Sequence, residues 1–107
     1  MQSTYFDNGQ KESEVLYING KPDGVYRTWY ITGELESEIM YYNGIRDGTM
    51  SEYYKNGQTK QVMKYEKNTL VKNSQITYYE SGKVQTMYVD NKLQEWDEEG
   101  NMIIEEI

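Results

Sequence analysis

Acidic side chains are the main candidates for chemistry in this 107-residue chain, which contains neither histidine nor cysteine. Those two absences exclude thiol nucleophiles, Cys/His zinc sites, and any catalytic triad or acid–base pair that uses imidazole. Glu36 and Glu38 are two residues apart, and paired carboxylates can serve as the acid and base of a glycosidase. Nothing around them in the sequence indicates a pocket, so we interpret them as solvated surface.

The run Asp97-Glu98-Glu99-Gly100 is the second acidic candidate, for a calcium site. It lacks the alternating Asp/Asn ligands and the glutamate at the twelfth loop position that such a site needs. The chain also contains no Gly-rich phosphate loop, no GxSxG elbow and no HExxH motif. We therefore expect a protein that is not an enzyme and that holds no metal or cofactor.

The net charge of −7 is unevenly distributed and argues against nucleic acid as a partner. Residues 1–52 carry −5, residues 53–89 carry +4 and residues 90–107 carry −6, so two acidic ends flank a mildly basic middle. No apolar run approaches the roughly 20 residues that span a bilayer, and the first residues do not resemble a secretory signal. We expect a soluble, cytoplasmic protein that does not bind membranes.

A repeat of about 24 residues organises the chain. The segments TYFDNGQ (4–10), TWYITGE (28–34), EYYKNGQ (52–58) and TYYESGK (77–83) align with one another, and EWDEEGN (95–101) is a frayed fifth copy. Their glycines are spaced by 24, 24, 25 and 18 residues. A second glycine set, Gly20 and Gly44, is replaced by Asn68 in the third copy, so the pattern decays toward the C-terminus.

Each repeat predicts two strands and two turns, because Asn-Gly between alternating sequences is a strong hairpin signal. No window shows helical spacing. We therefore predict an all-β fold, an elongated open antiparallel meander of about nine or ten strands in one domain, 1–107. Its repeats are expected at 4–27, 28–51, 52–76 and 77–94, with a partial copy at 95–107. Glu105 and Glu106 would blunt the edge of the last strand.

Alternation along the strands assigns residues to two faces. Tyr26, Thr28, Tyr30, Leu35, Ser37, Ile39 and Tyr41 are expected on a buried structural face. The opposite face would carry Glu36, Glu38, Met40 and Tyr42, with aromatic residues at matching repeat positions: Tyr5, Trp29, Tyr53 and Tyr78. Such an aromatic row either stabilises neighbouring strands or forms an exposed partner-binding surface.

The segments TWYITGELESEIMYYNGIRDG and EYYKNGQTKQVMKYEKN resemble the variant MORN repeat common in bacterial proteins. The resemblance covers roughly residues 4–90 and is closest in repeats one and two. Small proteins built of these repeats are similar to the YwqK-type antitoxin family. That resemblance implies a rigid sheet that binds and blocks a secreted toxin, and it supplies no catalytic residue.

Two classes of function remain open at this point. In the first, an immunity or antitoxin protein occludes a toxin with a basic active-site cleft, and acidic patches speed the encounter. The expected contact residues are Trp29, Tyr53, Tyr78, Glu36, Glu38, Met40 and Tyr42. A secondary acidic patch comprises Glu95, Asp97, Glu98, Glu99, Glu105 and Glu106. The alternative is a MORN-type structural scaffold or membrane-associated module, although anionic lipid would repel this charge. The oligomeric state stays open.

Overall fold

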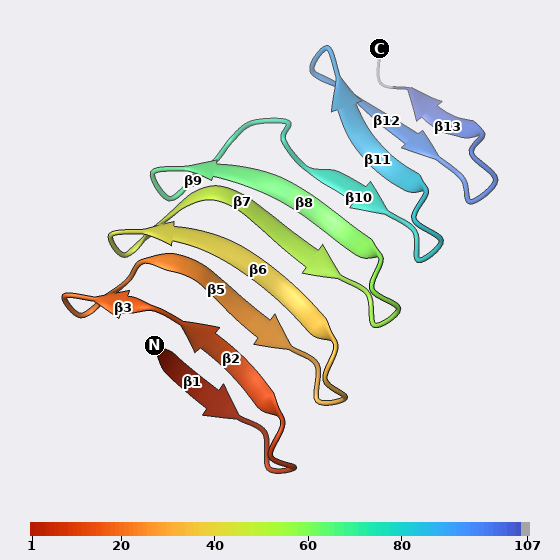
Figure 1. Ribbon diagram of the computed structural model, residues 1–107. Helices are drawn as coiled ribbons and strands as arrows, with labels where there is room; N and C mark the ends of the chain where they lie inside the picture. The colour runs from red at the N-terminus through yellow and green to blue at the C-terminus, as the bar shows by residue number, and fades with distance from the viewer. Residues whose placement is uncertain (106–107) are drawn as a thin grey trace.

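The computed structural model describes residues 1–105, which form a single-layered, elongated antiparallel β-sheet (Figure 1). Its principal extents are 47 × 33 × 13 Å, so its thickness is that of one sheet with its side chains. The radius of gyration is 16.2 Å, whereas a compact chain of this length would have about 13 Å. The described residues contain no helix, and the predicted all-β meander is confirmed.

Ten strands follow one another across the sheet in chain order. They are β1 (Gln2–Tyr5), β2 (Lys11–Val15), β5 (Gly24–Trp29), β6 (Leu35–Tyr42), β7 (Ile45–Tyr53), β8 (Thr59–Glu66), β10 (Ile76–Tyr78), β11 (Val84–Val89), β12 (Lys92–Trp96) and β13 (Met102–Glu105). Three two-residue strands were not foreseen: β3 (Tyr17–Ile18), β4 (Lys21–Pro22) and β9 (Thr69–Leu70). β3 pairs with β4 in a small separate hairpin, and β9 pairs with β8.

The turns at one end of the strands have two central residues with positive φ, as the Asn-Gly signal predicts. Asn43 and Gly44 have φ of 50° and 89°. The later copies keep this turn without glycine, because Lys67 and Asn68 have φ of 48° and 67°. Asparagine tolerates the left-handed region better than most residues. Loss of glycine therefore does not abolish the hairpin in repeat three.

The turns at the other end are longer. The amide of Gly57 donates to Tyr54 O at 3.0 Å, and the amide of Tyr54 donates to Gln58 O at 2.8 Å. Gly57 has φ 89°, and this pattern is the three-residue hairpin loop that ends in a glycine bulge. Beyond each such loop the register slips once more, for example between Thr28 and Trp29. Both irregularities recur in every repeat and decide which side chains share a face.

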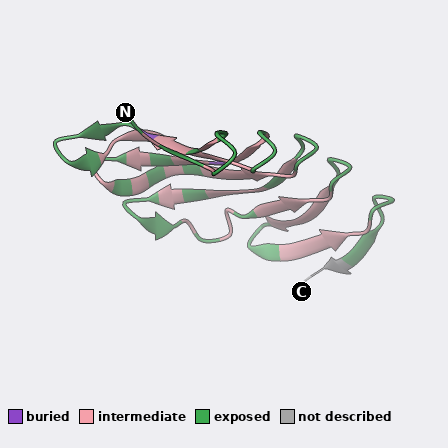
Figure 2. Cartoon of the chain, turned by 90° about the horizontal axis from the view of Figure 1, so that it is seen from below, coloured by how far each residue is buried: buried purple, intermediate pink, exposed green. Residues whose placement is uncertain are grey.

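No buried face separates the two sides of the sheet, contrary to the prediction of one structural face. Val15 is the only buried apolar residue among those whose burial the structure describes, and Ser37 is the only buried polar one. Trp29, Tyr30 and Tyr53 are all half-buried although they lie on different faces. Most strand residues are intermediate in exposure, as Figure 2 shows. A single layer cannot bury either face without a partner.

Tyrosine hydroxyls join the second, third and fourth repeats to the units that follow them. Tyr30 Oη donates to Tyr53 O at 2.6 Å, Tyr54 Oη to Tyr78 O at 2.6 Å, and Tyr79 Oη to Trp96 O at 2.8 Å. We call these three bonds the tyrosine latches. Phe6 occupies the equivalent position in the first repeat and has no hydroxyl. The first repeat is therefore attached without a latch.

Candidate interaction surface

Opposite faces of the sheet carry different chemistry. We call the side with Glu14, Arg27 and Glu38 the ion-pair face, because these side chains contact one another there. We call the side with Tyr26, Tyr30 and Tyr54 the tyrosine face, because it carries the tyrosine latches. Neighbouring side chains of a strand point to opposite faces. Arg27 lies between Tyr26 and Thr28 in β5, so these two residues lie on the face opposite to Arg27.

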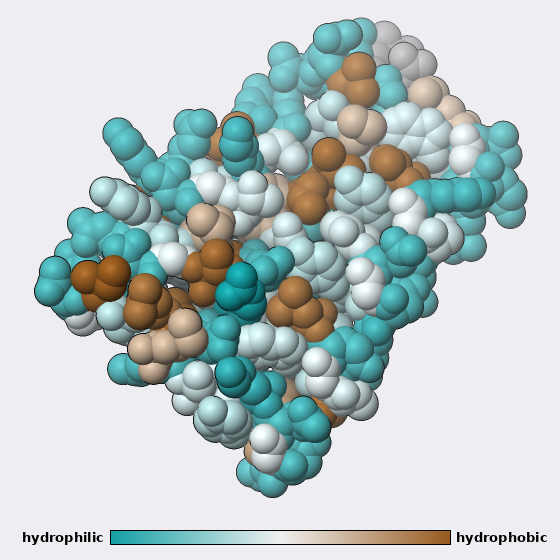
Figure 3. All heavy atoms as spheres, in the orientation of Figure 1, coloured by the Kyte–Doolittle hydropathy of each residue, from teal (hydrophilic) through white to brown (hydrophobic). Residues whose placement is uncertain are grey.

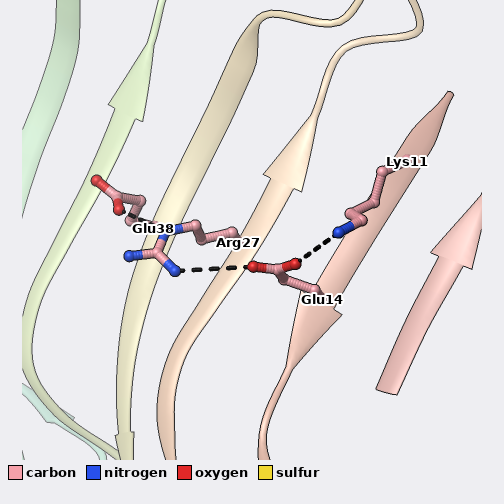
Figure 4. A network of polar contacts seen from close by, with 4 residues as sticks. All are labelled: Lys11, Glu14, Arg27 and Glu38. Carbon is pink, nitrogen blue, oxygen red and sulfur yellow. Dashed lines mark hydrogen bonds and ion pairs between the residues drawn. The ribbon is translucent and has the colours of Figure 1, made fainter. Parts of the chain in front are cut away.

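A chain of ion pairs crosses three neighbouring strands of the ion-pair face (Figure 4). Lys11 Nζ lies 2.9 Å from Glu14 Oε1 within β2. Arg27 of β5 lies between two carboxylates, with 3.8 Å to Glu14 Oε2 and 2.9 Å to Glu38 Oε2 of β6. Because acids and bases alternate and equal one another in number, the chain of ion pairs is electrically balanced.

Aromatic residues terminate this chain of ion pairs at both ends. Lys11 Nζ lies 5.7 Å from the ring centroid of Trp29, within the range of a cation–π contact. At the other end Tyr53 Oη donates to Glu38 Oε1 at 2.8 Å. Burial, followed by this bond to Glu38, raises the pKa of the Tyr53 hydroxyl above its ordinary value of 10.0. Two expected contact aromatics are thus held in place by charged neighbours.

Two further expected contact residues lie on the same face and are freely accessible. Alternation from Glu38 along β6 brings Met40 and Tyr42 to the ion-pair face, where they are 40% and 65% exposed. Tyr78 pairs with Val84 and is assigned to this face by alternation from Thr77. Figure 3 shows one face of the sheet, on which separate apolar groups alternate with hydrophilic side chains. Such a mixture is also found on ordinary protein surfaces, so the aromatic residues and Arg27 are the features of this face that favour an interface.

Glu36 does not belong to this surface, and its assignment beside Glu38 was wrong. The hydroxyl of Thr28 donates to Glu36 Oε1 at 3.1 Å, so the glutamate lies on the tyrosine face. The register slip between Thr28 and Trp29 inserts one extra residue, which turns Glu36 and Ser37 toward the same side. Simple alternation places Glu36 and Glu38 together and misses this bulge.

The same bulge overturns the assignment of Leu35 to the structural face. The residues equivalent to Leu35 in the first and fourth repeats are Lys11 and Val84, and both lie on the ion-pair face. Lys11 contacts Trp29 there. Val84 lines a shallow hollow with Met87 and Trp96. Sequence reasoning also passed over Lys11, Glu14 and Arg27 as site residues. A signal was present, since Glu14 and Glu38 occupy equivalent repeat positions around a single arginine.

One residue of the secondary acidic patch, Asp97, stabilises a turn with its side chain. Asp97 Oδ1 accepts hydrogen bonds from the amides of Glu99 and Asn101, at 3.0 and 2.9 Å. The bond from Asn101 is the main reason that the pKa of Asp97 is lowered. Glu98 is exposed. The pKa of the Tyr79 hydroxyl is raised, chiefly by burial and next by the neighbouring carboxylate of Glu95. Glu105 ends β13, opposite Gln94, while Glu106 lies outside the described residues.

Stacked hairpins in one uncovered layer define a β-repeat protein. Residues 2–19 and 46–67 match the family described as the MORN repeat variant. These matches support a MORN-repeat protein and a repeat-based protein-interaction scaffold. No curated protein matches the chain significantly. In residues 1–105 no helix has the length and apolar character needed to cross a membrane.

Proposed function

We propose that this protein is a cytoplasmic immunity or antitoxin protein that binds a cognate secreted bacterial toxin domain and occludes its active site. The observation that supports the proposal most is the uncovered ion-pair face, where aromatic residues flank a balanced chain of ion pairs. Interface centres favour tyrosine, tryptophan and arginine, and all three occur here. The protein would act by binding alone, without catalysis or a cofactor.

The chain of ion pairs gives this surface a fixed shape before any partner arrives. Arg27 is held from both sides, and Trp29 and Tyr53 are each tied to one end of the chain. Side chains that are already ordered lose less entropy on association, which favours affinity. We therefore assign anchoring to Trp29 and Tyr53, and peripheral contact to Met40 and Tyr42.

Surface plasmon resonance against the toxin domain encoded beside the gene tests this proposal. Trp29→Ala should raise the dissociation rate by about 30-fold, which corresponds to about 2 kcal/mol for a central anchor. Tyr42→Ala should weaken binding less, and with little loss of stability, because its ring is 65% exposed. Tyr88→Ala is the control for the opposite face, since alternation from Thr86 in β11 assigns this half-buried tyrosine to the tyrosine face.

Equal losses in Tyr42→Ala and Tyr88→Ala would contradict binding through the ion-pair face. Unchanged kinetics in both Trp29→Ala and Tyr42→Ala would remove this face and direct attention to Glu95, Glu98 and Glu99. If the neighbouring toxin domain does not bind the unaltered protein at all, the antitoxin proposal fails. The MORN-type structural scaffold would then be the better account.

A further inference from the structure

A hollow of about 600 Å³ lies on the tyrosine face between the first and second repeats. Aromatic rings and carboxylates share its lining: Phe6, Tyr26 and Tyr30 with Glu12 and Glu36. Its carboxylates and tyrosines belong to the tyrosine face, because Glu36 bonds to Thr28 and Tyr30 forms a latch on this side, and Trp29 also contributes to its lining. Neither the chain of ion pairs nor Tyr42 contributes to it.

The two carboxylates of the hollow lack basic partners. Each accepts one hydrogen bond from a threonine hydroxyl, Thr4 to Glu12 Oε1 at 3.2 Å and Thr28 to Glu36 Oε1 at 3.1 Å. Within residues 1–105 neither forms an ion pair, whereas Glu14 and Glu38 on the other face both do. Glu12 and Glu36 lie two strands apart, about 10 Å at the usual strand spacing. The hollow is therefore negatively charged.

The next repeats place their own lysines over the rings of this face. Lys55 Nζ lies 5.5 Å from the centroid of Tyr30, and Lys60 Nζ lies 5.8 Å from that of Tyr54. In the unit before, Ile31 occupies the position of Lys55, and Glu36 occupies that of Lys60. By repeat equivalence Phe6 therefore lacks the cation that Lys55 supplies to Tyr30, and among the described residues no lysine or arginine lies over Tyr26.

We propose that this hollow binds an arginine or lysine side chain from a basic segment of a protein partner. The aromatic walls would contact the cation as Tyr30 and Tyr54 contact Lys55 and Lys60, and Glu12 and Glu36 would accept its N–H groups. The inference does not depend on the antitoxin proposal, because the groups that would bind the cation are Phe6, Tyr26, Glu12 and Glu36, none of which is assigned to toxin binding there. In this proposal Glu36, rather than Glu38, attracts basic partners, because Glu38 is already paired with Arg27.

Titration of the protein with a capped hexa-arginine peptide, followed by NMR and calorimetry, tests the site. Resonances of Phe6, Tyr26 and Tyr30 should shift, and Glu12→Gln with Glu36→Gln should weaken binding about tenfold. The charge-matched control, Glu98→Gln with Glu99→Gln, changes the net charge equally and should alter the affinity less than about twofold.

A second variant tests the site without removing a carboxylate. Ile31→Lys restores the cation that Lys55 supplies in the next unit, and it should block the peptide while the protein stays folded. Equal weakening in the two charge-matched pairs would overturn the proposal, because attraction would then be non-specific. Undiminished binding by Ile31→Lys would also overturn it, as would choline binding as tightly as the peptide.

Discussion

Two strand pairings in the sheet, β2 with β5 and β8 with β10, are narrow, because each contains only two residue pairs. We call them the first and the second joint, and different side-chain interactions hold their strands together. At the first joint Glu14 lies opposite Arg27, and an ion pair connects them. At the second joint Val62 lies opposite Ile76, and the latch from Tyr54 reaches Tyr78 O across it. The first joint has no latch.

The repeat gives both joints the same backbone pairing, but the side chains that stabilise the two joints differ. In repeat proteins each unit contacts only its neighbours, so stability is approximately a sum over joints. Charge closes the first joint, and salt weakens exposed ion pairs. Apolar pairing and a hydroxyl bond close the second. We expect the first hairpin to be the less stable end and the more sensitive to salt.

Loss of a latch tyrosine should give the largest effect. Tyr54→Ala removes a half-buried ring that contacts Lys60 and bonds to Tyr78 O, so we expect a loss of about 3 kcal/mol in the free energy of unfolding. Tyr54→Phe keeps the ring and should lose only about 1 kcal/mol. Urea denaturation checks both. Equal losses would show that the ring contributes nothing beyond the hydroxyl bond.

Removal of the central arginine should have a smaller effect that depends on salt. Arg27→Met leaves Glu14 and Glu38 without their shared partner, and we expect a loss of about 1 kcal/mol at low ionic strength. In about 1 M NaCl the difference should nearly disappear. Lys92→Met serves as the control, because Lys92 is exposed and forms no ion pair within residues 1–105. A loss that persists in high salt would contradict closure by charge.

A latch added to the first joint should stabilise it. Phe6→Tyr places a hydroxyl where Tyr30, Tyr54 and Tyr79 each have one, and its acceptor by repeat equivalence is Trp29 O. We expect a gain of about 0.5–1 kcal/mol in urea denaturation, typical of one hydrogen bond. No gain, or a loss, would show that the first joint does not share the geometry of the others.

Acid should loosen the last turn slightly. Hydrogen bonds from the backbone, chiefly that of Asn101, lower the pKa of Asp97 below its ordinary value of 3.8. The stabilisation is therefore present above the unfolded pKa and is lost as the pH falls through the lower folded pKa. NMR of the Glu99 and Asn101 amides during acid titration should report this loss. Asp97→Asn should flatten the response, and an unchanged response would assign it to another group.

Turn signals made the meander predictable, whereas the bulges hid part of the surface. Asn43-Gly44 defined a hairpin from sequence alone, and its conformation is as expected. Glu36 was misplaced because a one-residue bulge leaves no residue type as its mark and yet breaks the strict alternation, so that Glu36 and Ser37 share a side. The expected structural face also failed, since alternation cannot reveal that no second layer covers the sheet.

Hydrogen exchange at low and high salt, followed residue by residue by NMR, tests the central claim most directly: one repeat geometry is closed by two chemistries. The amides between β2 and β5 should lose several-fold protection on transfer to about 1 M NaCl, where exposed charges are screened beyond about 3 Å. The amides between β8 and β10 should keep theirs. Equal changes at both joints would contradict the account and would remove the structural role of the ion pairs around Arg27.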